Sequence, residues 1–281
     1  MVTKVCMVTG ASSGIGKETA TRLAALGATV VMVCRSKGRG EKAKAEIVRK
    51  SGNGSVELVL ADFASFASVR SAAEAFLEKH DSLHVLVNNA GGVYVRRSET
   101  VDGLEATFQV DYLSHFLLTN LLLGVLKQSA PSRIVNVSSE AHYGGHVDLG
   151  DLQNSKGYGA MKAYSQAKLA QVLFTYELSR RLEGTGVTVN SLHPGAAATN
   201  IWKRPMGPFS FVGNLSRLFL ISPQEGAKTS VYLASSPDAE GVTGKYFDHG
   251  QEKQSSAESH DRALAHNLWT ESEKLTGLAG A

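Results

Sequence analysis

The feature that most constrains this chain is a glycine-rich turn at residues 9–17, which reads TGASSGIGK. An apolar run at 5–8 precedes the turn, and a helical pattern at 18–26 follows it. This order of strand, turn and helix places free N–H groups of a helix N-terminus where they can bind a phosphate. The spacing Gly-x-x-x-Gly-x-Gly therefore predicts a dinucleotide site, with a simple turn before a helix as the alternative.

Each glycine of this turn has its own predicted role. Gly10 allows the chain to turn sharply, Gly14 lets the backbone approach the phosphates, and Gly16 lets the helix pack close to the sheet. The residues predicted to bind the pyrophosphate are Gly10, Ser12, Ser13, Gly14, Ile15 and Gly16.

Apolar runs alternate with amphipathic helical patterns over most of the 281 residues. The predicted strands are 4–9, 29–34, 56–60, 85–88, 133–138, 187–192 and 245–247. The predicted helices are 17–26, 38–51, 65–79, 102–128, 163–183 and 223–235. Strands that are apolar almost throughout and alternate with helices are typical of a parallel sheet covered on both faces. We therefore predict a single Rossmann-type, doubly wound α/β domain over residues 1–281, with a seven-stranded, mostly parallel sheet.

The composition is typical of a soluble globular protein, with 43% hydrophobic residues, 20% charged residues and a net charge of +3. Because the sequence has no basic stripe, nucleic acid is not an expected partner. The two cysteines, Cys6 and Cys34, lie in apolar runs, which indicates a reducing compartment and no disulfide framework. No signal peptide is visible, and the most apolar run, 116–126, is too short to span a bilayer. We expect a cytoplasmic protein without a transmembrane segment.

The end of the second predicted strand indicates which cofactor is bound. In folds of this kind, an acidic residue about 20 positions after the glycine turn selects NAD by binding the ribose 2′-hydroxyl. Here Cys34 and Arg35 close the strand and Ser36, Lys37 and Arg39 follow, without a carboxylate. A guanidinium can pair with a 2′-phosphate through two parallel hydrogen bonds. Arg35 and Ser36 therefore predict NADP(H), unless the basic residues form only a solvated loop.

Two further strand ends supply candidate residues for the adenosine half of the site. Asp62 follows the third strand, where it can accept a hydrogen bond from the adenine amino group or cap the next helix. Asn88, Asn89, Ala90 and Gly91 end the fourth strand. Their paired amides can tie neighbouring strands together and line the adenosine side of the site, or the run can be a plain turn.

The sequence holds two Tyr-x-x-x-Lys motifs, Tyr158 with Lys162 and Tyr164 with Lys168. A tyrosine and a lysine four residues apart share one face of a helix, and the ammonium lowers the pKa of the phenol, which can then exchange a proton with a carbonyl or alcohol. Tyr158 has a glycine on each side, which disfavours a helix, whereas Tyr164 begins an amphipathic helix. We assign catalysis to Tyr164 and Lys168, and a place in the wall of the substrate cleft to Tyr158.

Ser138 and Ser139 end the fifth predicted strand, at the carboxyl edge of the sheet, where open α/β folds bind ligands. A hydroxyl there can donate a hydrogen bond to the substrate oxygen beside the tyrosine. Because side chains alternate along a strand, we expect Ser138 to point inward and Ser139 toward the substrate. A serine that caps a helix or turn is the alternative.

Together these motifs resemble the short-chain dehydrogenases/reductases, and within them the retinol-dehydrogenase-like and WW-domain-oxidoreductase-like group. The resemblance extends over almost the whole chain, and several motifs in order are more specific than any one of them. The matching stretches are TGASSGIG at 9–16, NNAG at 88–91, DYLSHFLLT at 111–119, VNVSS at 135–139, Tyr164 with Lys168, HPG at 193–195 and GKYF at 244–247.

The resemblance implies a role for each matching residue, with hydride moving between nicotinamide and the substrate carbon. Ser139 orients the substrate carbonyl, Tyr164 exchanges the proton, and Lys168 lowers the pKa of the tyrosine and holds the nicotinamide ribose. The other residues implied around the nicotinamide ribose and carboxamide are Asn89, Pro194, Gly195 and Thr199. The resemblance also implies a homodimer that pairs through the helices at 102–128 and 163–183.

One position departs from the pattern of the family. Where the family has an asparagine that holds a water in a proton relay to the lysine, this chain has Asp111. An asparagine side chain both donates and accepts hydrogen bonds, whereas a carboxylate only accepts them. Asp111 could hold the same water or pair with Lys168, and pairing would weaken the effect of the lysine on Tyr164. We expect catalytic activity with an altered pH profile.

The segment at 199–221 is rich in aromatic and apolar side chains, including Trp202. The family has a flexible segment over the cleft at this position, so we predict a lid, with Trp202 beside an apolar aldehyde, ketone or alcohol. An apolar helix packed on the core or on a partner chain is the alternative. No metal site is expected, because His142 and His146 are separated by two glycines and lack a third ligand.

The sequence as a whole predicts an NADP(H)-dependent oxidoreductase for an apolar carbonyl or alcohol, of the retinoid, steroid or lipid kind. A dinucleotide-binding regulator that has lost turnover is the second hypothesis, and Asp111 is the only sign in its favour. A sugar-nucleotide epimerase, which also uses Tyr-x-x-x-Lys, is the third. The Gly-x-x-Gly-x-x-Gly turn and the longer substrate domain of that class are missing from this sequence.

Overall fold

A computed structural model of the chain describes residues 1–195 and 221–278. In these residues a single eight-stranded sheet has the strand order β3-β2-β1-β4-β5-β6-β7-β8. Its strands are β1 (Val5–Thr9), β2 (Thr29–Cys34), β3 (Val56–Leu60), β4 (Val85–Asn88), β5 (Ser132–Val137), β6 (Val187–His193), β7 (Lys245–Asp248) and β8 (Gln251–Glu252). All neighbouring strands are parallel except β8, which pairs antiparallel with β7. The predicted fold class is confirmed. Among the strands the prediction missed β8, which is too short to show a periodicity.

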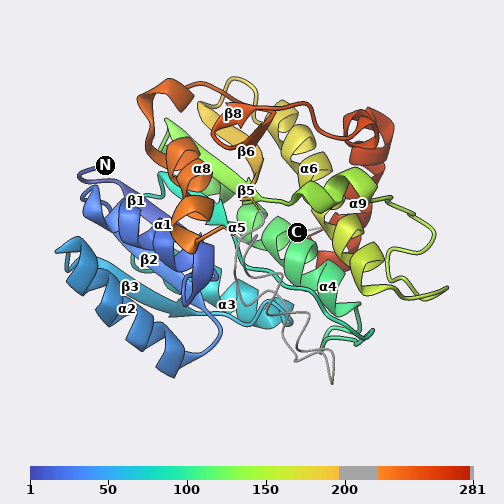
Figure 1. The fold of residues 1–281 in the computed structure, drawn as a ribbon, viewed down its shortest axis with the longest axis horizontal. Coiled ribbons are helices and arrows are strands. Elements are labelled where there is room, and N and C mark those ends of the chain that lie inside the picture. The colour runs from blue at the N-terminus through green and yellow to red at the C-terminus, as the bar shows by residue number, and fades with distance from the viewer. Residues whose placement is uncertain (196–220, 279–281) are drawn as a thin grey trace.

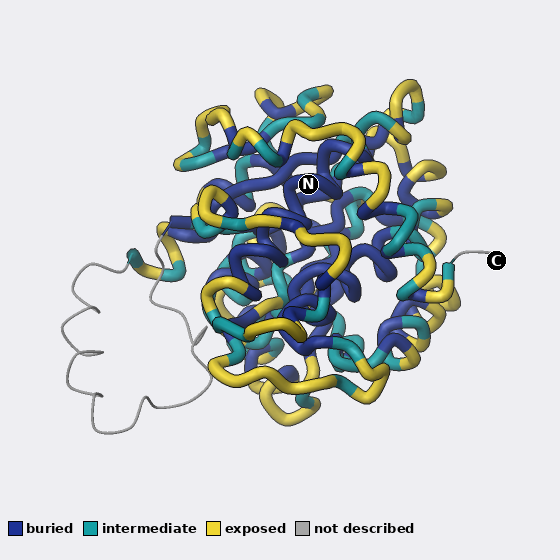
Figure 2. The backbone as a smooth tube through the Cα atoms, turned by 90° about the vertical axis from the view of Figure 1, so that its right-hand side faces the viewer, coloured by how far each residue is buried: buried dark blue, intermediate teal, exposed yellow. Residues whose placement is uncertain are grey.

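Helices cover both faces of this sheet (Figure 1). The main helices are α1 (Gly14–Ala25), α2 (Lys37–Ser51), α3 (Phe66–Leu77), α5 (Ser114–Gln128), α6 (Ala160–Arg181), α8 (Pro223–Ser235) and α9 (Arg262–Thr276). One apolar core joins the sheet to α1, α2 and α8, and a second joins it to α3, α5, α6 and α9. Figure 2 shows the buried backbone at the centre of the molecule.

Local sequence explains the helices that were predicted. In α3 the buried residues follow helical spacing, and the hydroxyl of Ser65 caps the first turn by accepting a hydrogen bond from the amide of Ser68 at 3.3 Å. Ser222 caps α8 in the same way, with Pro223 at the first helical position. The predicted boundaries of these helices lie within two residues of the observed ones.

The helix predicted at 102–128 differs from the structure. The chain forms a short helix, α4 (Ala106–Phe108), then a π-helical turn, η1 (Gln109–Leu113), and only then α5. In this turn the amide of Ser114 donates to the carbonyl of Gln109, five residues back. A π-helical turn inserts one extra residue into a helix and often marks a functional site. The extra residue shifts the phase of the side chains, and Asp111 lies inside the turn, fully buried.

The C-terminal helix α9, which the prediction missed, packs on α6 and α5. Trp269 meets Phe116 edge-on at 4.9 Å between ring centroids and stacks with Phe174 at 5.8 Å. The guanidinium of Arg181 lies 4.1 Å from the Trp269 ring, in a cation–π arrangement. The helices expected to pair with a second copy thus carry α9 of the same chain on one face. The homodimer stays a prediction. A second copy could contact these helices only on the surface that α9 leaves uncovered.

Candidate active site

A cavity of about 640 Å³ lies at the carboxyl ends of the parallel strands, where open α/β folds bind ligands. It brings together the glycine turn, the end of β2, the loops after β3 and β4, the end of β5 and one face of α6. The predicted residues that line it are Gly10, Ser12, Ser13, Gly14, Ile15, Gly16, Arg35, Asp62, Asn89, Ala90, Gly91, Tyr164, Lys168 and Pro194. Residues predicted at both ends of a dinucleotide therefore share one continuous cavity.

The phosphate end of the cavity is the N-terminus of α1. Gly10 and Gly14 have φ angles of +68° and +58°, the left-handed region that favours glycine. A Cβ on Gly16 would lie 2.3 Å from Nδ2 of Asn89, so only glycine allows this approach. Ser13 makes no side-chain cap, and the first turn of α1 has no acidic residue. The N–H groups at the start of the helix can therefore receive a pyrophosphate.

The adenosine end of the cavity is basic. Arg35 and Arg39 both line it, and both residues are exposed. Ser36 does not line the cavity, because it lies at the N-cap of α2. A 2′-phosphate on the ribose would lie near two guanidinium groups here. Arg39 therefore joins Arg35 as a predicted contact of that phosphate.

Of the two roles predicted for Asp62, the structure excludes the helix cap and leaves the contact with adenine open. Asp62 lines the cavity, so its carboxylate is available to an adenine amino group. Its Oδ1 accepts a hydrogen bond from the amide of Ala64 at 3.1 Å, which closes a tight turn. The cap of the next helix is Ser65, not Asp62.

The two asparagines at the end of β4 make different contacts. Asn88 is fully buried and donates from Nδ2 to Oγ1 of Thr119 and Oδ1 of Asn136, both at 2.9 Å, which ties β4 to α5 and β5. It therefore holds the elements together and does not line the cavity. Asn89 does line the cavity, and its Nδ2 donates to the carbonyl of Thr9 at 2.8 Å.

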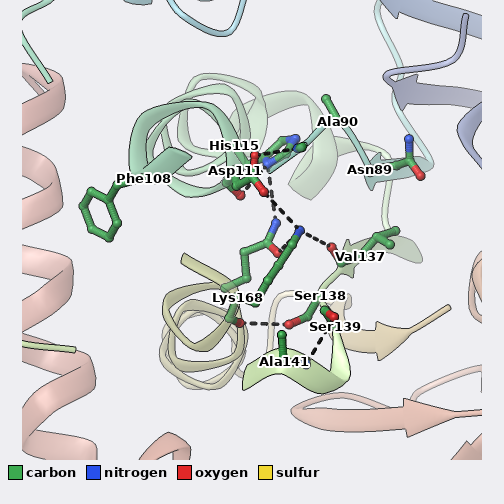
Figure 3. Close-up of polar contacts among 12 residues, drawn as sticks. Asn89, Ala90, Phe108, Asp111, His115, Val137, Ser138, Ser139, Ala141 and Lys168 are labelled. Atoms are coloured by element: carbon green, nitrogen blue, oxygen red, sulfur yellow. Dashed lines mark hydrogen bonds and ion pairs between the residues drawn. The ribbon is translucent and has the colours of Figure 1, made fainter. Parts of the chain in front are cut away.

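The two serines after β5 make different contacts, and Ser138, which was expected to point inward, is the one that lines the cavity. The hydroxyl of Ser138 donates to the carbonyl of Lys168 at 2.8 Å and thereby fixes β5 to α6. The hydroxyl of Ser139 accepts a hydrogen bond from the amide of Ala141 at 3.2 Å (Figure 3). Its side chain also interacts with Tyr164 and lowers the pKa of the phenol. Ser139 caps a short turn and lies beside the phenol. Its hydrogen bond to a substrate oxygen stays a prediction.

Tyr164 and Lys168 lie on one face of α6, which begins at Ala160. The Lys168 Nζ is 5.5 Å from the centroid of the Tyr164 ring. It donates to the carbonyl of Val137 and to Oε1 of Gln171, both at 3.0 Å. The ammonium thus has a fixed position between the strand end and the helix, beside the phenol.

Tyr158 precedes α6 and is not part of this arrangement. Its hydroxyl donates to the carbonyl of Tyr94 at 2.5 Å and lies 3.3 Å from Oγ1 of Thr107. Tyr94 lines the cavity, whereas Tyr158 supports it from behind. This geometry favours Tyr164 over Tyr158. Tyr94, and not Tyr158 itself, lies in the wall of the cavity, and Tyr158 contacts Tyr94.

Asp111 lies close to Lys168. Its Oδ1 accepts from the amide of Gly92 at 2.9 Å, and its Oδ2 is 3.8 Å from the Nζ of Lys168 (Figure 3). Burial lowers the pKa of Lys168, and the carboxylate opposes that change. Pairing with the lysine is therefore the arrangement that this structure shows.

The same carboxylate acts on Tyr164. Burial raises the pKa of the Tyr164 phenol, Asp111 raises it further, and the hydrogen bond with Ser139 opposes the rise. This direction is opposite to the lowering expected from Lys168. The expected lowering of the pKa does not occur, because burial of the phenol and the nearby negative charge of Asp111 both favour the neutral form.

We expect an Asp111→Asn variant to shift the pH–rate profile to lower pH by roughly one unit. Loss of the carboxylate removes a charge that disfavours the tyrosinate, so the pKa of Tyr164 falls. In alcohol oxidation the rising limb moves to lower pH, and in carbonyl reduction the falling limb does the same. The measurement is kcat/KM against pH in both directions, and superimposable profiles would show that Asp111 has no electrostatic role.

Several cavity residues carried no signal in the sequence. The hydrophobic and small ones are Val33, Ala61, Phe63, Gly92, Tyr94, Val110 and Val137. Gln171, which holds the lysine, was part of an unremarkable helical stripe, although its position three residues after Lys168 could have indicated a contact. Thr199 and Trp202, with most of the predicted lid at 199–221, lie outside the described residues.

Within the described ranges, no group of three or more histidine, cysteine, aspartate or glutamate side chains could hold a metal ion. His142 and His146 have separate partners: a ring nitrogen of His142 lies 2.7 Å from the carbonyl of Ser139, and one of His146 lies 3.0 Å from Glu258. At residues 1–195 and 221–278, no helix is long and apolar enough to cross a bilayer.

A helix N-terminus that can bind a pyrophosphate and a Tyr–Lys pair that can exchange a proton share one cavity, and this defines the class of nicotinamide-dependent oxidoreductases. The sequence profile of the short chain dehydrogenase family matches residues 4–206. The chain belongs to this family, in its retinol-dehydrogenase-like branch.

Known relatives agree with this assignment. The chain is 44% identical to retinol dehydrogenase 14 of Homo sapiens, over 98% of this chain and 87% of that protein. A crystal structure of a protein from Mycobacterium Paratuberculosis has a TM-score of 0.81 and 34% identity, with 98% of this chain and 94% of the other covered. The RhlG/NADP active-site complex of Pseudomonas aeruginosa has a TM-score of 0.72 and 26% identity, with 88% and 95% covered.

Proposed function

We propose that the protein is an NADP(H)-dependent oxidoreductase that interconverts an apolar aldehyde or ketone and the corresponding alcohol, with a retinoid-, steroid- or lipid-like carbonyl compound as substrate. The observation that carries the proposal is that Tyr164 and Lys168 line the same cavity as Arg35 and Arg39. The retinol dehydrogenases among its relatives support the apolar substrate class, and the NADP complex of RhlG supports the cofactor.

The chain's own residues divide the chemistry among them. When bound, the nicotinamide supplies or accepts the hydride. The Tyr164 hydroxyl donates a proton to the substrate oxygen in reduction and takes it back in oxidation. Ser139 holds that oxygen beside the phenol, and Lys168 supplies a positive charge that stabilises the tyrosinate when the proton leaves. Asn89 and the glycine turn position the cofactor so that the nicotinamide lies beside these groups.

The test is a direct assay with NADPH or NADH and a panel of apolar aldehydes and ketones that includes retinaldehyde, followed by absorbance. We expect oxidation of NADPH with the apolar aldehydes and at least tenfold lower kcat/KM with NADH, because a charge-assisted pair with the 2′-phosphate is worth roughly 1.5–3 kcal/mol. Faster turnover with NADH would contradict the cofactor assignment. Turnover only with small polar carbonyls would contradict the substrate class.

The second candidate function is a dinucleotide-binding regulator with little turnover. The observation in its favour is that burial and Asp111 both raise the pKa of Tyr164, which works against tyrosinate formation. Tight binding of NADPH without turnover of any carbonyl or alcohol across the pH range would favour this function. Turnover that rises in the Asp111→Asn variant would favour the enzyme.

A further inference from the structure

His115 is a buried polar residue that the mechanism above does not use. It lies in the first turn of α5, only 1% exposed, with its ring edge-on to Phe63 at 4.9 Å. Nδ1 is 3.1 Å from the carbonyl of Asp111, and Nε2 is 3.2 Å from Oγ1 of Thr9 (Figure 3 labels His115 and Asp111). One imidazole therefore connects the end of β1 with the π-helical turn η1.

The neighbours of His115 determine which ring nitrogen carries the proton. The Asp111 carbonyl can only accept a hydrogen bond, so Nδ1 must carry the hydrogen. Oγ1 of Thr9 accepts from the amides of Asn89 at 2.8 Å and Ala90 at 2.9 Å. Its own hydrogen has two acceptors within reach, the carbonyl of Val87 at 3.4 Å and Nε2 of His115 at 3.2 Å, and the shorter distance favours Nε2.

The opposite tautomer would be poorly bonded. It would place two lone pairs against each other at the Asp111 carbonyl and bring a third donor to Oγ1 of Thr9. The side-chain amide of Gln171 would be its only donor to Nδ1, at 3.5 Å. The assigned Nδ1–H form is neutral, and burial lowers the pKa of His115 to about 3, so the ring keeps this form across the usual assay range.

Both ends of this connection reach the active site. Through Thr9, the ring holds the amides of Asn89 and Ala90, which line the cofactor cavity. Through the Asp111 carbonyl, it holds the turn whose carboxylate lies 3.8 Å from Lys168. A displacement of the ring would therefore loosen the cofactor loop at one end and move a charge beside the lysine at the other.

We propose that His115 is a positioning residue that couples the cofactor loop at Asn89 and Ala90 to the turn that carries Asp111. The inference rests on the proposed function, because its readouts are NADPH binding and turnover. It predicts that the two ring nitrogens have separable effects, one on the cofactor and the other on the pH profile.

Two amide variants separate these effects. A His115→Gln side chain can place its oxygen near the Nε2 position and accept from Thr9, but it has no donor at Nδ1. A His115→Asn side chain can place its N–H near Nδ1, but it does not reach Thr9. We expect H115N to weaken NADPH binding by roughly fivefold and to keep the wild-type pH profile. We expect H115Q to bind NADPH within about twofold of wild type and to shift the profile to lower pH by roughly half a unit.

A double variant tests whether the shift passes through Asp111. In an Asp111→Asn background, H115Q should cause no further pH shift, because the charge that the ring positions is already gone. The matched control is His84→Gln. His84 accepts from the amide of Val5 at 3.1 Å, at the opposite edge of the sheet, so its loss should leave NADPH binding and the pH profile unchanged.

The outcomes separate this inference from the proposed function. If wild type neither binds NADPH nor reduces a carbonyl, the proposed function fails. If wild type does both, and the His115 variants lose only thermal stability, His115 has a merely structural role and the inference is wrong. Should the variants not fold, the tautomer can be read in the wild-type protein by long-range 15N–1H NMR of labelled histidines. An Nε2–H ring at His115 would overturn the inference, and an Nδ1–H ring would support it.

Discussion

A Tyr164→Phe variant should lose catalytic activity by about a thousandfold in kcat/KM, within the 10²–10⁴ range typical of a lost general acid or base. The phenol hydroxyl is the group beside Ser139 that can exchange a proton with the substrate oxygen. The aromatic ring is buried, only 6% exposed, and phenylalanine keeps its packing, so folding should be nearly unaffected. The affinity for NADPH should change little, and fluorescence titration beside the kinetic assay checks both expectations.

Two other tyrosines provide the controls for this variant. Tyr176 lies on the same helix, and its hydroxyl contacts Oγ of Ser255 at 2.6 Å, away from the cavity, so Tyr176→Phe should keep wild-type kinetics. Tyr158→Phe should change kcat/KM by less than roughly tenfold, because it removes only the hydrogen bonds of the Tyr158 hydroxyl with Tyr94 and Thr107, behind the cavity. An active Tyr164→Phe together with an inactive Tyr158→Phe would reverse the assignment of the catalytic tyrosine.

The cofactor half of the site could be predicted because its parts are contiguous in sequence. The glycine turn lies between its strand and its helix, so Gly10, Gly14 and Gly16 reach the cavity whatever the rest of the chain does. The Tyr164–Lys168 pair is likewise set by the period of one helix. The parallel sheet follows from apolar strands that alternate with helices, and its register places these segments at one edge.

The polar network behind the cavity could not be predicted, because it depends on contacts between distant segments. The bond between His115 and Thr9 joins residues 106 positions apart. It also depends on the π-helical turn at Asp111, and a single extra residue in a turn leaves no periodic trace over so short a stretch. The direction of the pKa shift at Tyr164 depends on burial, which only the packed structure gives. The sequence showed that an aspartate, Asp111, replaces the asparagine of the family. It left open whether Asp111 pairs with Lys168 or holds a water.

An Arg35→Asp variant should reverse the cofactor preference. Arg35 directly follows β2, is exposed and lines the same cavity as Arg39. Its loss removes a charge-assisted pair with the 2′-phosphate, and the new carboxylate repels that phosphate while it can accept from a free 2′-hydroxyl. We expect Kd for NADPH to rise by roughly a hundredfold and NADH to become the better substrate.

Lys37 provides the control for the Arg35 variant, because it is a basic neighbour that does not line the cavity. Lys37 is exposed in the first turn of α2 and does not line the cavity, so Lys37→Asp makes the same change in net charge without touching the ribose. It should weaken NADPH binding only by a screened, long-range amount that disappears at high salt. Arg39→Ala should have an intermediate effect, because a second guanidinium remains at the phosphate. Equal losses in the Arg35 and Lys37 variants would mean that the basic loop acts through its overall field, and NADP(H) selection by Arg35 would then be wrong.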